Sequence, residues 1–189
     1  MPEESRVPVA PRIPTPFGLL RPAVEDDAPS LLDYRIRNRT HLAPWEPARD
    51  ATYHTLAGCI VAIAEADEAA RLDRGYLLLM LSPDERRVLG TVRFANLVRG
   101  AFQACHLGYG LDVSLQGRGL MREALDVALN WAFGELDLHR IMANYMPRNQ
   151  RSAALLHTLG FQREGYAPKY LKIAGKWEDH VLTAKVRRY

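Results

Sequence analysis

One short segment combines residue types that suit the binding of a phosphorylated ligand. Residues 116–121 read Gln-Gly-Arg-Gly-Leu-Met and follow an apolar, strand-like stretch that ends at Val113. A helix predicted to begin at Gly119 has free N–H groups and partial positive charge at its N-terminus. Two glycines allow that backbone to approach a pyrophosphate closely, so the segment predicts a phosphate-binding turn.

The two glycines alone do not identify the ligand. The turn lacks the Gly-Lys-Ser/Thr ending of a P-loop and the third glycine of a dinucleotide-binding fingerprint. Four nearby arginines could add charge-assisted contacts to phosphate oxygens, and for each of them a solvated surface position is the alternative. They are Arg118, Arg122, Arg148 and Arg151.

A second polar pattern lies at the start of a later predicted helix. Asn149 precedes a helix that runs to about Leu159 and is closed by Gly160, and Ser152 lies in its first turn. Because Asn and Ser are common helix-capping residues, a structural role is the alternative to ligand binding for both.

The segments that must position these residues alternate between strand-like and helix-like patterns. The strand expected at 105–113 contains Gly108 and Gly110, which favour a bulge or a close backbone approach. The order strand, helix, helix, three strands, helix, strand, helix and two strands predicts a mixed α/β (α+β) layered fold. The expected strands are 17–21, 76–81, 88–97, 105–113, 140–146, 163–173 and 177–185, and the expected helices are about 29–39, 50–72, 119–136 and 149–159.

Length and composition are those of one folded domain. A chain of 189 residues, 48% hydrophobic and 25% charged, can bury one core but is short for two ordinary domains. Residues 1–16 contain five prolines, which remove backbone donors and fix φ, so we expect an extended or disordered arm there. The single domain is then expected to span residues 17–189.

The charged, Cys and His residues argue against several kinds of site. The balance of 25 basic and 22 acidic residues gives a net charge of only +3 without a long basic stripe, so no nucleic-acid role is expected. Cys59 and Cys105 form no CxxC pair and the six histidines lack ligand spacing, so we expect no metal. No apolar run is long enough to span a bilayer and the N-terminus has no signal core, so we expect a cytoplasmic protein.

Taken together, the two motifs resemble the coenzyme-binding pattern of the GNAT-type N-acetyltransferase superfamily. Gln116 and Gly119 match its sequence Gln/Arg-x-x-Gly-x-Gly/Ala, and Met121 departs from it at the last position. The superfamily's downstream pattern of Asn, a small residue and a closing Gly-Phe is matched by Asn149, Ser152, Gly160 and Phe161.

Longer segments are similar to the bacterial ribosomal-protein-alanine N-acetyltransferases, over about residues 17–186. The segments that carry this likeness are 42–47, 139–147, 159–161, 164–166 and 177–184. The resemblance implies transfer of an acetyl group from acetyl-CoA to the N-terminal α-amine, expected to be that of alanine, of a ribosomal protein by direct attack in a ternary complex. It also implies a mostly antiparallel sheet of six to seven strands with about four helices and a splay between the fourth and fifth strands.

The resemblance further implies which residues bind the coenzyme. The acetyl-pantetheine arm would lie where strand 107–113 parts from strand 140–146, and the turn would hold the pyrophosphate. The cofactor-binding residues expected on this basis are Leu111, Val113, Gln116, Gly117, Arg118, Gly119, Leu120, Met121, Asn149 and Ser152.

Acetyl transfer needs a neutral amine and a proton for the departing thiolate. At a pH near 7.4, neutralising an α-amine of pKa roughly 8 costs about 0.8 kcal/mol, against about 4 for lysine, so a weak base suffices. Glu46 is the candidate base, with a helix-entry carboxylate as the alternative. Ser152 is the acid that the relatives imply, since Leu156 stands where many members have a Tyr. Lys169 stands where some relatives have a carboxylate, which argues against a base at that position.

The acceptor side and the exact activity are less constrained. The expected substrate-binding residues are Trp45, Glu46, Tyr145 and Tyr170, for whose aromatic rings buried packing is the alternative. Two other functions stay open, an acetyltransferase for a small-molecule amine and a non-catalytic acyl-coenzyme A-binding protein. A monomer and a homodimer both fit the sequence.

Overall fold

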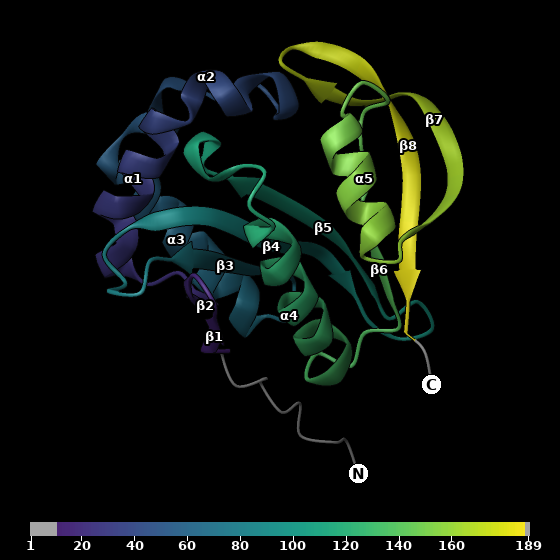
Figure 1. Cartoon of the computed structure of the whole chain (residues 1–189), viewed down its shortest axis with the longest axis horizontal. Coiled ribbons are helices and arrows are strands. Elements are labelled where there is room, and N and C mark those ends of the chain that lie inside the picture. Colours follow the sequence, from purple (N-terminus) through teal and green to yellow (C-terminus); the bar gives the residue numbers. More distant parts are fainter. Residues whose placement is uncertain (1–10, 188–189) are drawn as a thin grey trace.

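A single eight-stranded sheet runs through the part of the chain that the computed structural model describes, residues 11–187 (Figure 1). Its strand order is β1-β2-β3-β4-β5-β6-β8-β7. Neighbouring strands are antiparallel except for β5 and β6, which are parallel. The strands are β1 (Ile13–Thr15), β2 (Gly18–Pro22), β3 (Tyr76–Leu81), β4 (Val88–Val98), β5 (Ala104–Leu111), β6 (Arg140–Met142), β7 (Gln162–Ile173) and β8 (Lys176–Val186).

Helices cover both faces of this sheet (Figure 1). Leu78 and Met80 of β3 belong to a core cluster with α4, whereas Leu79 and Leu81 belong to a cluster with α1 and α3. Successive strand residues point to opposite faces, so a strand covered on both sides needs an uninterrupted apolar run such as 76–81. The α-helices are α1 (Ala28–Arg37), α2 (Arg39–Leu42), α3 (Leu56–Arg71), α4 (Leu120–Gly134) and α5 (Gln150–Thr158), and the short 3-10 turns are η1 (Glu25–Asp27), η2 (Ala43–Trp45), η3 (Ala51–His54) and η4 (Val113–Leu115).

The mixed, mostly antiparallel α/β fold expected from the sequence is confirmed, but the expected counts were wrong. The sheet has eight strands instead of six to seven, because β1 lies within the expected arm and pairs with β2. The described residues contain five α-helices rather than about four, because the chain makes one further turn, α2, before the proline at 44. The remainder of the arm, residues 1–10, lies outside the described residues, and the boundary at residue 17 stays a prediction.

Two caps divide the helix expected at 50–72. Asp50 accepts hydrogen bonds from the backbone of Thr52 and Tyr53 and begins η3. Thr55 then accepts from the N–H of Gly58 and begins α3. Side chains that bind their own backbone in this way compete with a continuous helix, so the segment forms a turn followed by a shorter helix.

The feature that shapes the molecule is the parting of β5 from β6. The two strands pair only from Ala104↔Arg140 to His106↔Met142. Beyond that point β5 stays paired with β4 as far as Leu111, whereas the chain after β6 turns to β8, where Tyr145 bridges Val181. The predicted splay is thus present, between the fifth and sixth strands because β1 advances the count by one.

A small polar cluster fixes the place where β5 ends. The amide oxygen of Asn38, a fully buried residue at the end of α1, accepts a hydrogen bond of 2.9 Å from the N–H of Val113. Asp112 accepts hydrogen bonds from the backbone and hydroxyl of Ser114 and from the Arg37 guanidinium. Burial opposes the ionisation of Asp112, but these hydrogen bonds outweigh it and lower its pKa to about 2.

None of the helices within residues 11–187 is both long enough and apolar enough to cross a membrane.

Acid should destabilise the protein partly through Asp112. Since its pKa is lowered on folding, its contribution of about 2 kcal/mol is complete above pH ~4 and is lost as the pH falls toward 2. We expect the difference in unfolding free energy between the wild type and Asp112→Asn, measured by urea denaturation, to shrink between pH 4 and 2. The exposed Asp126→Asn serves as the control, and a pH-independent difference for Asp112→Asn would contradict this assignment.

Candidate functional site

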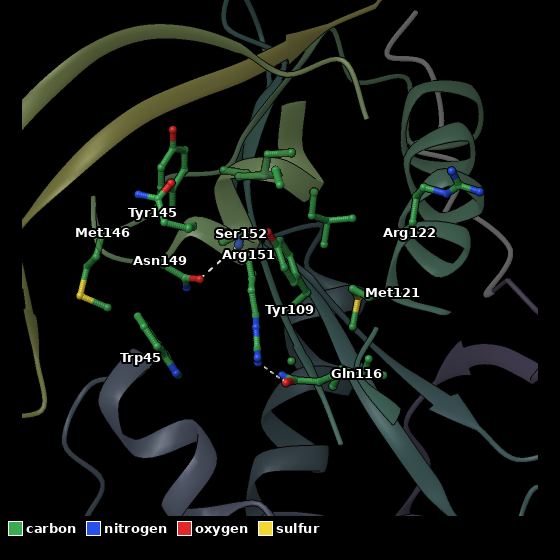
Figure 2. A pocket seen from close by; sticks show the side chains of 18 of the residues that line it. Trp45, Tyr109, Gln116, Met121, Arg122, Tyr145, Met146, Asn149, Arg151 and Ser152 are labelled. Atoms are coloured by element: carbon green, nitrogen blue, oxygen red, sulfur yellow. Dashed lines mark hydrogen bonds between the residues drawn. The ribbon is translucent and has the colours of Figure 1, made fainter. Parts of the chain in front are cut away.

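A cavity of about 940 Å³ occupies the space that opens between β5 and the chain after β6 (Figure 2). Its walls come from α2 and η2, from β5, from the turn 116–121, and from residues 143–156. In Figure 2, Gln116 and Met121 lie at one side of the cavity and Trp45, Tyr145 and Met146 at the other, with Tyr109 and Ser152 between them.

The predicted turn lies along this cavity with its helix N-terminus open. Gly119 is the N-cap of α4 with φ +80°, and Gly117 has φ +76°, a backbone conformation that favours glycine. A Cβ placed on either residue would meet no other atom within 4 Å. The start of α4 thus lines the cavity with open space around both glycines, and its role in binding an anion stays a prediction.

The side chain of Gln116 joins this turn to two other elements. Its amide nitrogen lies 2.9 Å from Nε2 of His41, and its amide oxygen accepts a hydrogen bond from Arg151 of α5. Burial lowers the pKa of His41, and the positive charge of Arg151 lowers it further. A neutral His41 can accept the hydrogen bond from the Gln116 amide, which holds the turn between α2 and α5.

Asn149 and Ser152 lie at the other wall of the cavity. Asn149 caps α5, because its amide oxygen accepts a hydrogen bond of 3.1 Å from the N–H of Ser152. The Ser152 hydroxyl lies 2.6 Å from the Tyr109 hydroxyl (Figure 2). Burial raises the pKa of Tyr109 to about 12, so this pair of hydroxyls stays protonated.

Tyr109 is a candidate residue that the sequence analysis missed. Leu156, at the position where many GNAT members have a Tyr, is buried in the core. A phenol reaches the cavity instead from the facing strand, β5. The available signal was the sequence Gly-Tyr-Gly at 108–110, within a strand expected to part from its neighbour.

An aromatic and cationic wall closes the opposite side. The guanidinium of Arg148 lies 5.0 Å from the centre of the Trp45 ring, donates to the carbonyl of Pro44 and pairs with Glu178 at 3.2 Å. Arg148 thus joins the η2 segment to β8. Trp45 and Tyr145, both predicted to bind the acceptor, line this part of the cavity.

His180 of β8 also lines the cavity and was missed, because the histidines were judged only by metal-ligand spacing. It is 3% exposed, and its Nδ1 lies 3.0 Å from the carbonyl oxygen of Glu178. A carbonyl only accepts, so Nδ1 carries the proton and Nε2 of a neutral ring keeps its lone pair. The Tyr170 ring packs against this imidazole with a centroid distance of 5.6 Å.

Four predicted site residues lie outside the cavity. Arg118 is exposed, and Val113 is 49% exposed and donates its N–H to Asn38. Glu46 pairs with Arg49 at 3.3 Å and lines a different hollow. Tyr170 does not line the cavity, but its ring packs against His180, which does. The other predicted residues line the cavity; they are Trp45, Leu111, Gln116, Gly117, Gly119, Leu120, Met121, Tyr145, Asn149 and Ser152.

Between residues 11 and 187, no group of three or more His, Cys, Asp or Glu side chains is arranged to hold a metal ion.

Comparison with known proteins extends the likeness over nearly the whole chain. A family model described as an acetyltransferase (GNAT) domain matches residues 19–162. The chain is 43% identical over 173 residues to the [ribosomal protein uS5]-alanine N-acetyltransferase of Escherichia coli K12, covering 92% of this chain and 89% of that protein.

Two solved structures share the fold closely. The ribosomal-protein-S5-alanine acetyltransferase of Vibrio fischeri superposes with a TM-score of 0.89 at 40% identity, over 93% of this chain and 96% of that one. The Mycobacterium smegmatis RimJ in complex with CoA-disulfide superposes with a TM-score of 0.86 at 30% identity, over 94% of this chain and 86% of that one.

Adding a methyl group at Gly119 should impair the binding of coenzyme A more than it impairs folding. Gly119→Ala places a Cβ at the mouth of the turn, and Gly100→Ala is a matched control, because Gly100 also has positive φ and open space around it. Each variant should lose about 1 kcal/mol of stability from the left-handed backbone. Only Gly119→Ala should raise the Kd for coenzyme A in calorimetric titration, by about tenfold or more; equal Kd values for the two variants would argue against the turn as the binding site.

Proposed function

This chain belongs to the GNAT-domain acetyltransferase family, and on that premise we propose that it acetylates the N-terminal α-amine of a ribosomal protein, with alanine as the expected first residue. The chain is thus an N-acetyltransferase. The observation that carries the choice of acceptor is the similarity to the E. coli enzyme, which extends beyond the coenzyme turn to the acceptor-side segments.

The cavity fits acetyl-CoA as co-substrate. The coenzyme supplies the acetyl group as an activated thioester. The open N–H groups at the start of α4 would bind its pyrophosphate, and Arg122 and Arg151, which line the cavity, would contribute positive charge. The edge of β5 from 107 to 111, which has no strand partner on the β6 side, would offer backbone groups to the pantetheine arm.

Ser152 and Tyr109 together can return a proton to the leaving thiolate. Their hydroxyls are 2.6 Å apart, so one can donate to the sulfur while the other replaces the proton. The high pKa of Tyr109 ensures that the pair carries protons at neutral pH. The acid role proposed for Ser152 therefore includes a partner from β5.

We place the base at His180 rather than at Glu46. The Nδ1 of His180 contacts the Glu178 carbonyl, which leaves Nε2 as the ring nitrogen for an amine, and the residue lines the cavity, whereas Glu46 is paired with Arg49 and does not. A neutral imidazole is a suitable acceptor for the proton of an α-amine, whose pKa of roughly 8 lies close to working pH. Glu46 remains the alternative base and is tested below.

The lining of the cavity disfavours a polyamine as acceptor. A polyamine carries several positive charges and needs carboxylates around it, but the cavity lining within the described part of the chain contains no Asp or Glu. It contains three arginines instead, Arg122, Arg148 and Arg151.

Intact-mass spectrometry of ribosomal proteins tests the function directly. In a strain that lacks this protein, the intact mass of one ribosomal protein should be lower by about 42 Da, the mass of one acetyl group. The gene supplied in trans should restore the original mass. Unchanged masses for all ribosomal proteins would remove the basis for this acceptor.

Replacement of His180 should slow acetyl transfer in a pH-dependent way. We expect His180→Gln to lower kcat/KM for an alanine-initiated peptide by about 100-fold at pH 7, because general base catalysis contributes at least that much. The defect should diminish near pH 9, where the amine loses its proton to solvent.

Two variants serve as comparisons. His157→Gln changes an exposed histidine of α5 and should retain activity. Glu46→Gln should lower kcat/KM by less than about threefold, the effect of a substitution without a catalytic role. If Glu46→Gln shows the large, pH-dependent loss and His180→Gln does not, the base is Glu46.

A further inference from the structure

A second hollow, of about 690 Å³, lies next to the acceptor side of the cavity. It is formed by the ends of α1 and α2, by residues 46–51 and by η3, with Ala174 of the β7–β8 turn at its edge. Leu42 lines both this hollow and the main cavity. The neighbouring residues Trp45 and Glu46 line the cavity and the hollow respectively, so the two spaces lie on either side of one loop.

The hollow contains a buried cation without a carboxylate partner. Arg35 is 8% exposed, and its guanidinium lies 4.0 Å from the centre of the Tyr53 ring. Its Nη1 donates to the Tyr53 carbonyl and to the Cys59 sulfur, and Arg35 forms no ion pair with any carboxylate of residues 11–187. Burying an uncompensated charge is unfavourable, and such charges are typical of binding sites.

The other charged groups of the hollow do not neutralise the positive charge of Arg35. Glu46 is paired with Arg49, and the Asp50 carboxylate accepts hydrogen bonds from the first residues of η3. Arg39 is exposed and forms no ion pair within the described part of the chain. Burial lowers the pKa of His54, and the positive charges of Arg39, Arg35 and Arg49 lower it further against the opposing charge of Glu46, so positive charge prevails at the imidazole.

We propose that this hollow binds the carboxylate side chain of an acidic residue that follows closely behind the N-terminus of the acceptor polypeptide. The inference rests on the proposed function, since it needs a polypeptide acceptor. The cavity and the hollow adjoin at the loop that carries Trp45 and Glu46, so an acceptor whose first residue lies in the cavity can cross this loop, and an extended chain advances about 3.3 Å per residue. A side chain within the first several residues can therefore reach the two unpaired guanidiniums, which bind carboxylates well.

A series of synthetic peptides tests this assignment. Each octapeptide begins with Ala and carries a single Glu at one of positions 3 to 7 among Ser, Gly and Gln residues, and the reference peptide carries Gln at every one of these positions. At one position, Glu should raise kcat/KM by about tenfold over Gln, mainly through a lower KM, as expected for a charge-assisted contact. The absence of a Glu preference at every position would overturn the proposal.

Variants of the two unpaired arginines localise the effect. Arg39→Gln should abolish the Glu preference and leave the rate on the Gln peptide unchanged, because Arg39 is exposed and lies outside the cavity. Arg35→Met should do the same, and Arg39→Gln decides if Arg35→Met fails to fold. Arg71→Gln, at the end of α3, removes a charge far from the hollow along the chain and should keep the preference. Loss of activity on both peptides alike, or a retained preference in Arg39→Gln, would refute the site.

The His54 signal in NMR distinguishes the acceptor carboxylate from a free anion. A bound carboxylate offsets the nearby arginines, so the Glu peptide should raise the His54 pKa whereas the Gln peptide should not. Inorganic phosphate at millimolar concentration is the comparison. If phosphate raises the His54 pKa and the Glu peptide does not compete with phosphate, the hollow binds a small anion and the proposal fails. If none of the peptides is acetylated, the proposed function fails instead, a result distinct from equal acetylation of Glu and Gln peptides.

Discussion

The parting of β5 from β6 is the constraint on which the other features of this protein depend. Parallel pairing ends at His106↔Met142, and from there the two chains follow different partners, β4 and β8. The cavity exists because no strand fills the space between them. The turn 116–121, the Tyr109–Ser152 pair and His180 all line that space from different elements. In a closed sheet, these residues would be ordinary surface or core residues.

Buried polar groups help to hold the loop after β5 in place. Asn38 accepts a hydrogen bond from the N–H of Val113. Asp112 caps η4 and also forms an ion pair with Arg37. These contacts fix the turn relative to α1, and Gln116 fixes it relative to α2 and α5. Because a buried polar group without its partner is costly, small displacements of the turn are disfavoured, which keeps the helix N-terminus directed into the cavity.

Most elements, and most of the residues expected to bind the coenzyme as lining of one cavity, could be predicted from the sequence, because local rules determine them. The apolar runs of β3 and β4, the glycines of the turn and the Asn149 cap each act over a few residues. The acceptor side could not be predicted equally well. Glu46 and His180 are distant in the chain, and which of them faces the cavity depends on how the loop after α2 meets β8. The missed strand β1 likewise depends on its partner β2, because prolines give no strand signal of their own.

The strand order β6-β8-β7 has a consequence for the order of events during synthesis. β8, which is the last strand in the sequence, lies between two strands that precede it, and its neighbouring turn donates the N–H of Ala174 to the carbonyl of Glu46, 128 residues earlier. A nascent chain can therefore form the sheet from β1 to β6, together with α4, while the edge of β6 that β8 will cover is still open. The wall of the cavity is complete only when the segment 176–186 has left the ribosome and paired with its neighbours, so a shorter chain would have the turn 116–121 but would lack His180.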